Sequence, residues 1–298
     1  WKCNSGYYKN NNYCSKLPSN AIARSYSDGF YCKSGYEKSG SSCIAQINAE
    51  DAYKKAETAY ENKDYQTAFR EFSILAKSGN EKAQNYIGYM YRKGYGVTKD
   101  DKLGVSWYLK AANQGYSTAQ VNLGYMYDMG YGVTKDYKLA VSWFRKSANQ
   151  GNFTAQNNLG VMYENGNGVT KDYKLAVSWY LKAANQGNAR GQINLGTMYE
   201  NGNGVTKDYK LAVSWYRKSA NQGNDSGQWN LGTMYEDGKG VAQSDKLALS
   251  WYRKAANQGH SNAKKDLKAL ELKIKNKEDE AKTIIPANAY ASSSDSKG

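Results

Sequence analysis

The chain is poor in the residues on which most enzymes and metal centres depend. Its 298 residues include only two prolines, one histidine and four cysteines. The single histidine, His260, permits no Ser/His/Asp or Cys/His constellation, which argues against nucleophilic catalysis. Acidic residues are scattered singly, so no metal site is predicted. No apolar run approaches the roughly 18 residues of a membrane-spanning helix, so no integral membrane segment is expected.

Aromatic and basic residues are abundant instead. There are 28 tyrosines and 7 tryptophans, and 41 Lys and Arg face 27 Asp and Glu, giving a net charge of +14. The aromatic side chains supply buriable surface that disordered chains lack. Much of the charge recurs in columns such as Lys138, Lys174 and Lys210, which we interpret as a solvated face. A basic surface can also attract nucleic acid or an anionic cell surface.

The sequence is dominated by an internal repeat of 36 residues. A Leu/Ile-Gly pair and a Ser-Trp pair recur with this period, as does Asn-Gln-Gly with its glycine at Gly115, Gly151, Gly187, Gly223 and Gly259. No insertion separates the units. This spacing predicts units that stack on their neighbours in one geometry, as in a solenoid.

Each unit is predicted to form two helices. In the first copy, one helix spans 81–93 and stops at paired glycines, and a second runs from the N-cap Asp100 to Asn113, with Gly115 as the C-terminal cap. A glycine lies in the middle of every first helix, as at Gly88, where it costs about 1 kcal/mol relative to alanine. Its recurrence predicts that a neighbouring helix approaches too closely for a side chain.

The repeated motif resembles a known family. The pattern is similar to the Sel-1-like repeat of tetratricopeptide-like solenoids, and reads Ala119-Gln-x-x-Leu123-Gly124-x-Met126-Tyr127-x-x-Gly130-x-Gly132-Val133, then Asp136-x-x-Leu139-Ala140-x-x-Trp143-Phe144 and Gln150-Gly151. The resemblance implies an all-α, right-handed α/α superhelical solenoid whose first helices line a concave groove. Bacterial members are commonly adaptors, host-interaction factors or immunity proteins against secreted toxins. Some cysteine-rich relatives have been described as penicillin-binding or weakly β-lactam-hydrolysing, but they carry cysteine pairs inside the repeats, and this chain has none there.

The amino-terminal segment is a second, smaller duplication. The stretch from Cys3 to Cys14 is echoed from Cys32 to Cys43 at an offset of 29 residues. The duplication favours disulfides Cys3–Cys14 and Cys32–Cys43, which would indicate an oxidising compartment and argue against a nucleic-acid partner. Structural zinc is the alternative, although zinc-binding cysteines usually lie two to four residues apart.

Five regions are therefore expected: a duplicated cysteine-rich module at 1–43, an N-terminal capping hairpin at 44–79, five repeats at 80–259, a C-terminal capping helix at 260–282, and a linker at 283–298. The phrase Leu17-Pro18-Ser-Asn20-Ala21 returns as Ile285-Pro286-Ala-Asn288-Ala289. The first copy precedes Cys32. We therefore expect the chain to be an excerpt, with a further cysteine module beginning beyond Gly298.

Comparison of the five copies identifies a candidate binding face. Three positions of the first helix vary among the copies, and their offsets of four and three residues place them on one face. By resemblance, this face looks into the groove, with Trp229 as an aromatic anchor and acidic residues toward the carboxyl end. The candidate partner-binding residues are Asn85, Tyr89, Arg92, Tyr125, Asp128, Glu164, Ile193, Glu200, Trp229 and Glu236.

These observations favour a monomeric, non-enzymatic scaffold or adaptor of the bacterial envelope or secreted space. It would bind a protein or basic peptide in the groove. Neither a cofactor nor a metal is expected. A cell-wall or glycan-binding protein that acts through the cysteine-rich modules is the alternative. A β-lactam-interacting enzyme is less favoured, because the Ser261-x-x-Lys264 pattern lies in ordinary repeat register.

Overall fold

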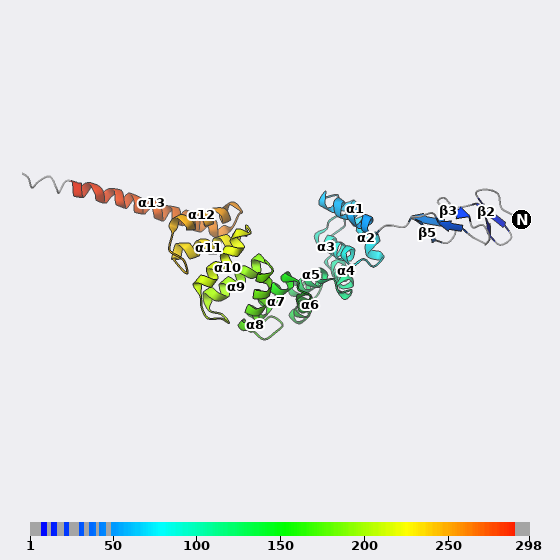
Figure 1. Ribbon diagram of the computed structural model, residues 1–298, viewed down its shortest axis with the longest axis horizontal. Coiled ribbons are helices and arrows are strands. Elements are labelled where there is room, and N and C mark those ends of the chain that lie inside the picture. The colour runs from blue at the N-terminus through cyan, green and yellow to red at the C-terminus, as the bar shows by residue number, and fades with distance from the viewer. Residues whose placement is uncertain are drawn as a thin grey trace, which may run out of the picture. The chain divides into compact units, whose positions relative to one another are not determined.

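The computed structural model combines short strands with a long series of helices (Figure 1). It describes the backbone of residues 7–10, 13–16, 21–23, 30–32, 36–39, 42–45 and 49–289, and the side chains of 50–280. The helices are α1 (Ala49–Glu61), α2 (Tyr65–Lys77), α3 (Glu81–Lys93), α4 (Asp101–Asn113), α5 (Ser117–Met129), α6 (Tyr137–Asn149), α7 (Phe153–Asn165), α8 (Tyr173–Asn185), α9 (Ala189–Asn201), α10 (Tyr209–Asn221), α11 (Asp225–Asp237), α12 (Asp245–Asn257) and α13 (Ser261–Ala289).

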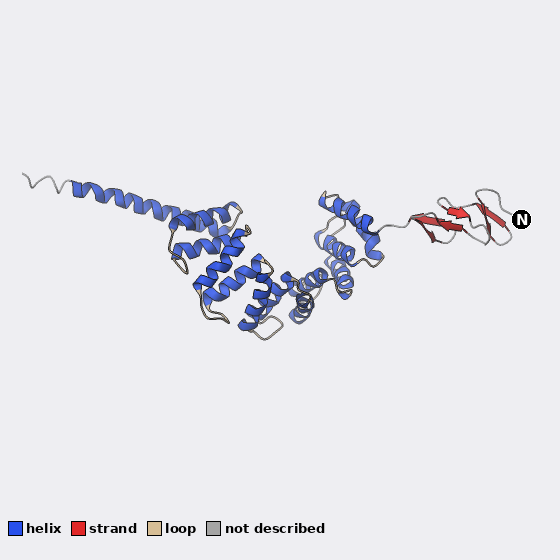
Figure 2. Cartoon of the chain, viewed as in Figure 1, coloured by secondary structure: helices blue, strands red, loops and turns tan. Residues whose placement is uncertain are grey.

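Strands occupy the amino-terminal segment (Figure 2). They form three two-stranded antiparallel pairs: β1 (Tyr7–Asn10) with β2 (Tyr13–Lys16), β3 (Ala21–Ala23) with β4 (Phe30–Cys32), and β5 (Tyr36–Ser39) with β6 (Ser42–Ala45). The β5–β6 hairpin repeats the β1–β2 hairpin 29 residues later, so the duplicated sequence adopts one backbone form twice. The cysteine side chains lie outside the described residues, and the predicted disulfides stay a prediction.

The chain divides into two compact units, 1–107 and 108–298. In the first unit, α1, α2 and α3 pack around Phe72, Leu75, Ile87 and Met90, each at most 3% exposed. Tyrosines surround this core. Burial and neighbouring phenols raise the pKa of Tyr60, which packs edge-to-face on Tyr65 and Tyr86.

The second unit is a stack of hairpins, each with an odd-numbered and an even-numbered helix. Each odd helix from α5 to α11 ends at a glycine with a left-handed backbone, such as Gly202 with φ of 75°. Each following even helix begins at a side-chain cap. Asp208 Oδ1, for example, accepts the Leu211 amide at 2.9 Å. The caps explain why helix lengths are constant and why the hairpins stay in phase.

A row of buried glutamines joins one hairpin to the next. Gln192, only 4% exposed, donates to the Ala184 carbonyl at the end of α8. Its own side-chain oxygen accepts from Gln222, which follows α10, at 2.8 Å. The same two bonds recur at Gln120, Gln156 and Gln228. This glutamine ladder adds a side-chain hydrogen bond to one of the carbonyls at the ends of α4, α6, α8 and α10, where the helical bonding pattern stops.

The last helix departs from the repeat. Where α11 is capped by Gly238, the corresponding residue of α13 is Ile274, and the helix continues to Ala289 instead of the expected 282. Ala263, Leu267 and Leu270 cover the end of the stack. None of the helices within residues 49–289 is long and apolar enough to cross a membrane.

Candidate partner-binding face

The mid-helix glycines make room for an aromatic ring. A Cβ added at Gly196 would lie 2.6 Å from the ring of Tyr216, and the same conflict arises at Gly160 with Tyr180 and at Gly232 with Tyr252. The predicted close approach is confirmed, and the group that approaches is a side chain of the paired even helix. Glycine is required because any larger residue would overlap the ring.

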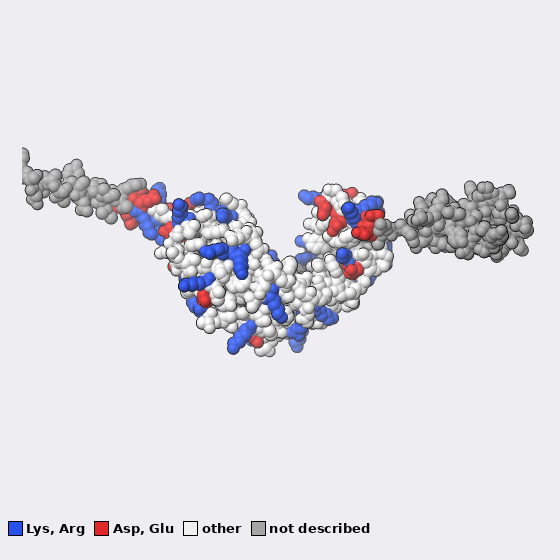
Figure 3. Space-filling model, in the orientation of Figure 1, with Lys and Arg blue, Asp and Glu red and all other residues white. Residues whose placement is uncertain are grey.

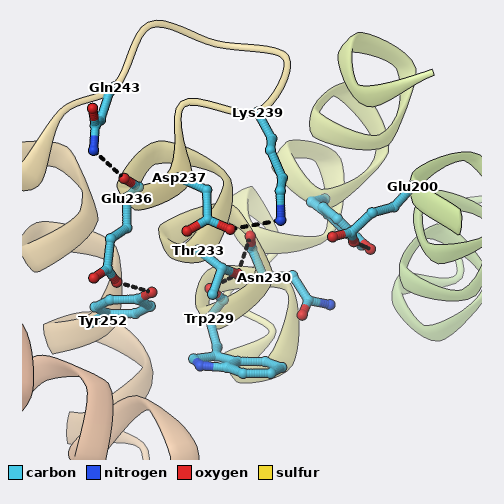
Figure 4. A network of polar contacts seen from close by, with 10 residues as sticks. Glu200, Trp229, Asn230, Thr233, Glu236, Asp237, Lys239, Gln243 and Tyr252 are labelled. Carbon is cyan, nitrogen blue, oxygen red and sulfur yellow. Dashed lines mark hydrogen bonds and ion pairs between the residues drawn. The ribbon is translucent and has the colours of Figure 1, made fainter. Parts of the chain in front are cut away.

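Each tyrosine whose ring lies over a glycine forms a hydrogen bond with a glutamate one turn further along the odd helix. The hydroxyl of Tyr180 donates to Glu164 at 2.5 Å, that of Tyr216 to Glu200 at 2.6 Å, and that of Tyr252 to Glu236 at 2.8 Å. Figure 4 shows the last pair. Three Gly-Tyr-Glu sets are thus built at one position of three successive hairpins.

Burial keeps the three tyrosines of these pairs protonated. Burial, and then the hydrogen bond to the glutamate, raise the pKa of all three tyrosines above the ordinary value. The phenols therefore remain donors throughout the physiological range. In Glu164 and Glu200, the second carboxylate oxygen accepts no hydrogen bond from the described residues. Each of these two carboxylates is oriented through one oxygen.

The hairpin α5–α6 carries a variant of this set. Phe144 lies against Gly124 and has no hydroxyl to donate, and the acid one turn on is the shorter Asp128. Burial raises the pKa of Asp128, and the positive charge of Lys135 opposes the rise. The first hairpin of the second unit therefore lacks the tyrosine donor that orients the acid in the three later hairpins.

One lysine of the chain lies close to the last glutamate of the row. Lys273 Nζ lies 3.9 Å from Glu236 Oε1. Lys239 pairs instead with Asp237 at 2.8 Å, and this contact, together with the more distant charge of Glu200, raises the lysine pKa. An ammonium group therefore lies at ion-pair distance from Glu236 within the chain itself.

Trp229 is engaged inside the chain. Its indole Nε1 donates to Asp266 of α13 at 2.7 Å, and its ring stacks on His260 at 5.3 Å. The corresponding Asn157 accepts from Asn194 of the next odd helix at 2.9 Å. At these two places the column joins an odd helix to the next one, α7 to α9 and α11 to α13. Of the other members, Asn85 is 9% exposed and Ile193 is partly buried.

The sequence-predicted residues divide between the two units. Asn85, Tyr89 and Arg92 belong to the first, and Tyr125, Asp128, Glu164, Ile193, Glu200, Trp229 and Glu236 to the second. The residues that sequence reasoning missed are the tyrosines Tyr180, Tyr216 and Tyr252. Their conserved spacing of 16 residues from the glutamates is visible in the sequence, but their ring direction is not.

Within the part of the chain whose side chains are described, no group of three or more His, Cys, Asp or Glu could hold a metal. His260 Nδ1 accepts the Ala263 amide at 3.1 Å and caps α13. The arrangement can bind cations and hydrogen-bond donors. The fold and this face together define a helical-repeat binding protein.

Comparison with known proteins identifies the family. The Sel1 repeat model matches residues 81–116, 117–152, 154–188, 189–224 and 225–260. The chain belongs to the Sel1 repeat family, whose repeats mediate protein–protein interaction and whose scaffold proteins are generally non-enzymatic. The resemblance seen in the sequence is confirmed. A search of curated proteins finds no match.

Solved structures agree with this assignment. A Sel1 repeat protein from Oxalobacter formigenes is 38% identical with a TM-score of 0.68, over 73% of this chain and 86% of that one. A protective antigen of uropathogenic Escherichia coli with an SLR fold is 38% identical with a TM-score of 0.67, over 74% of this chain and 48% of that one. An immunity protein from Pseudomonas aeruginosa, 24% identical with a TM-score of 0.50 over 71% and 82%, shares the fold.

Proposed function

We propose that the protein is an extracytoplasmic adaptor that binds a basic segment of a partner protein along the odd-helix face. The observation that carries this proposal is the row of glutamates Glu164, Glu200 and Glu236, each oriented by a buried tyrosine. A carboxylate that is held in place by one oxygen loses little freedom when the other oxygen binds a cation. Preorganised charges of one sign select partners of the opposite sign.

Two further observations support the proposal. Lys273 Nζ lies 3.9 Å from Glu236 Oε1 within the chain, which supports an ammonium group as the partner's side chain at this position. The similar structure from uropathogenic Escherichia coli is described as a protective antigen, which suits a protein accessible outside the cytoplasm. Together with the cysteine-rich module, this supports a location in the envelope or secreted space.

Peptide binding tests the proposal directly. Short unstructured peptides that alternate lysine with neutral residues should bind the intact chain, and counterparts with glutamate in place of lysine should not. The double variant Glu164→Gln, Glu200→Gln should lower the affinity at least about tenfold, because each charge-assisted contact contributes on the order of 1 kcal/mol or more. Fluorescence anisotropy provides the measurement.

The matched control is Glu271→Gln with Glu278→Gln on α13, which makes the same change in net charge away from the face. Binding that falls equally in both double variants would assign the effect to overall charge. Binding that is unchanged in the first variant would reject the face.

A further inference from the structure

The even-numbered helices of the second unit present a surface of opposite character. On α6, α8, α10 and α12, eleven basic residues accompany one acidic residue, Asp245. On α5, α7, α9 and α11, six acidic residues accompany one basic residue, Arg190. The stack thus separates its charge between two layers. Figure 3 shows basic side chains outnumbering acidic ones over the visible face of the second unit.

Eight lysines of the even layer are available to bind an external anion. They are Lys138, Lys146, Lys174, Lys182, Lys210, Lys218, Lys246 and Lys254, and all are exposed. Among the described residues, none of the eight forms an ion pair with a carboxylate. The arginines differ, because Arg145 and Arg217 donate to tyrosine hydroxyls and Arg253 pairs with Glu271.

Tryptophan holds four of these lysines in one geometry. Lys146, Lys182, Lys218 and Lys254 each place Nζ over the tryptophan three residues earlier, between 3.8 and 4.1 Å from the ring centroid. A cation over an aromatic face is fixed without being neutralised. The result is a regular row of ammonium groups, one in each hairpin.

Leucine is exposed among the lysines. Leu139, Leu211 and Leu247 follow the first lysine of their helices and are 42%, 42% and 43% exposed, and Leu181 is 39% exposed. Leu139, Leu211 and Leu247 recur at one position of the repeat, and Leu181 stands where α6, α10 and α12 carry arginine, so the even layer offers apolar side chains and positive charge side by side. This combination is typical of surfaces that bind at the interface of an anionic bilayer.

We propose that the even-helix layer of the second unit is a peripheral docking surface for an anionic phospholipid bilayer. The lysines bind lipid phosphates, and the leucines enter the boundary between headgroups and acyl chains. The leucines favour a bilayer over a soluble polyphosphate or a nucleic acid, because a polymer of phosphates gains nothing from apolar side chains. Docking in this way turns the acidic odd-helix face away from the lipid.

Vesicle co-sedimentation tests this surface. The full chain should bind vesicles of equal parts phosphatidylcholine and phosphatidylglycerol, and vesicles of phosphatidylcholine alone should leave it in solution. Added salt should release it. The variant with Lys138, Lys174, Lys210 and Lys246 all changed to Gln should bind more weakly, by about fivefold for each lysine removed.

Two comparisons make the test specific. The control with Lys264, Lys265, Lys268 and Lys275 changed to Gln alters net charge equally on α13 and should retain binding. The variant Leu139→Gln, Leu211→Gln, Leu247→Gln keeps every charge and should still lose several-fold affinity for vesicles. Circular dichroism confirms that each variant is folded.

The outcomes separate cleanly. The proposal is supported if vesicle binding weakens in the even-layer lysine variant and in the leucine variant but not in the α13 control. Equal loss in the α13 control, unchanged vesicle binding by the leucine variant, or binding to polyphosphate or duplex DNA but not to vesicles would each overturn it. Because the odd-helix face is intact in all these variants, peptide binding by that face is measured independently.

Discussion

The hairpin α5–α6 and the three hairpins that follow it solve the same packing problem with different chemistry. All four place an aromatic ring on a mid-helix glycine. In α5–α6 the ring is Phe144 and the acid is Asp128, whereas each later hairpin has a tyrosine with a glutamate at hydrogen-bond distance. The ring and the acid thus change together. The fold therefore requires a flat ring over the glycine. The later hairpins add a carboxylate that the tyrosine hydroxyl holds in place.

Disrupting the packing of a ring on glycine, which all four hairpins share, should have the largest effect on stability. Gly196→Ala places a methyl group 2.6 Å from the Tyr216 ring. The expected overpacking penalty is about 1–3 kcal/mol, and alanine regains roughly 1 kcal/mol over glycine in helix propensity, so a net loss of up to about 2 kcal/mol is predicted. Denaturant unfolding measures it. In a Tyr216→Ala background the same methyl should cost much less, and an equal cost there would show that the ring is not the obstacle.

Exchanging the residues that differ between the hairpins should have a smaller effect on stability. Tyr216→Phe keeps the ring and removes the donor to Glu200, with an expected loss of about 1 kcal/mol, at the lower end for a hydrogen bond to a charged group because the glutamate is only partly buried. Phe144 shows that the fold accepts phenylalanine at this position. The reciprocal Phe144→Tyr with Asp128→Glu should install the missing pair and stabilise α5–α6. If Tyr216→Phe left both the free energy of unfolding and peptide affinity unchanged, the hydroxyl would have no positioning role.

The N-cap residue of the last odd helix differs from those before it, and we expect changes at these caps to have the smallest effect on stability. Asn152, Asn188 and Asn224 cap their helices through an amide oxygen, whereas His260 caps α13 through Nδ1. Both kinds of cap satisfy a backbone amide at the start of a helix, so removing the acceptor should destabilise that helix. His260→Ala and Asn188→Ala are each expected to lose about 0.5–1 kcal/mol. Denaturant unfolding of both variants checks it, and an unchanged free energy of unfolding for His260→Ala would contradict a capping role at α13.

Local signals made most of the solenoid predictable. The helix over 81–93, the cap at Asp100 and the glycine at Gly115 all follow from chemistry within a few residues, and the structure places them as expected. The strands at the amino terminus were not anticipated because each is only three or four residues long. The continuation of α13 past 282 was missed because no glycine ends it where Gly238 ends α11.

The candidate face was predictable in position but not in detail. Variation among the copies identified Glu164 and Glu200, since a partner-binding column is free to differ from a packing column. Tyr216 was not among the predicted residues, because its spacing from Glu200 does not reveal that its buried ring brings the hydroxyl to that glutamate. Trp229 was predicted as an aromatic anchor of the groove, and its bond to Asp266, 37 residues away, depends on how two odd helices meet.

The glutamine ladder has a consequence for how the stack comes apart. Gln192 completes its bonds only when the hairpin before it and the turn after it are both in place. Loss of a terminal hairpin exposes one such residue to water at little cost, but loss of an internal hairpin strands buried amides on both sides. Fraying should therefore proceed inward from the ends. Amide hydrogen exchange should slow from the outer hairpins toward α8 and α9.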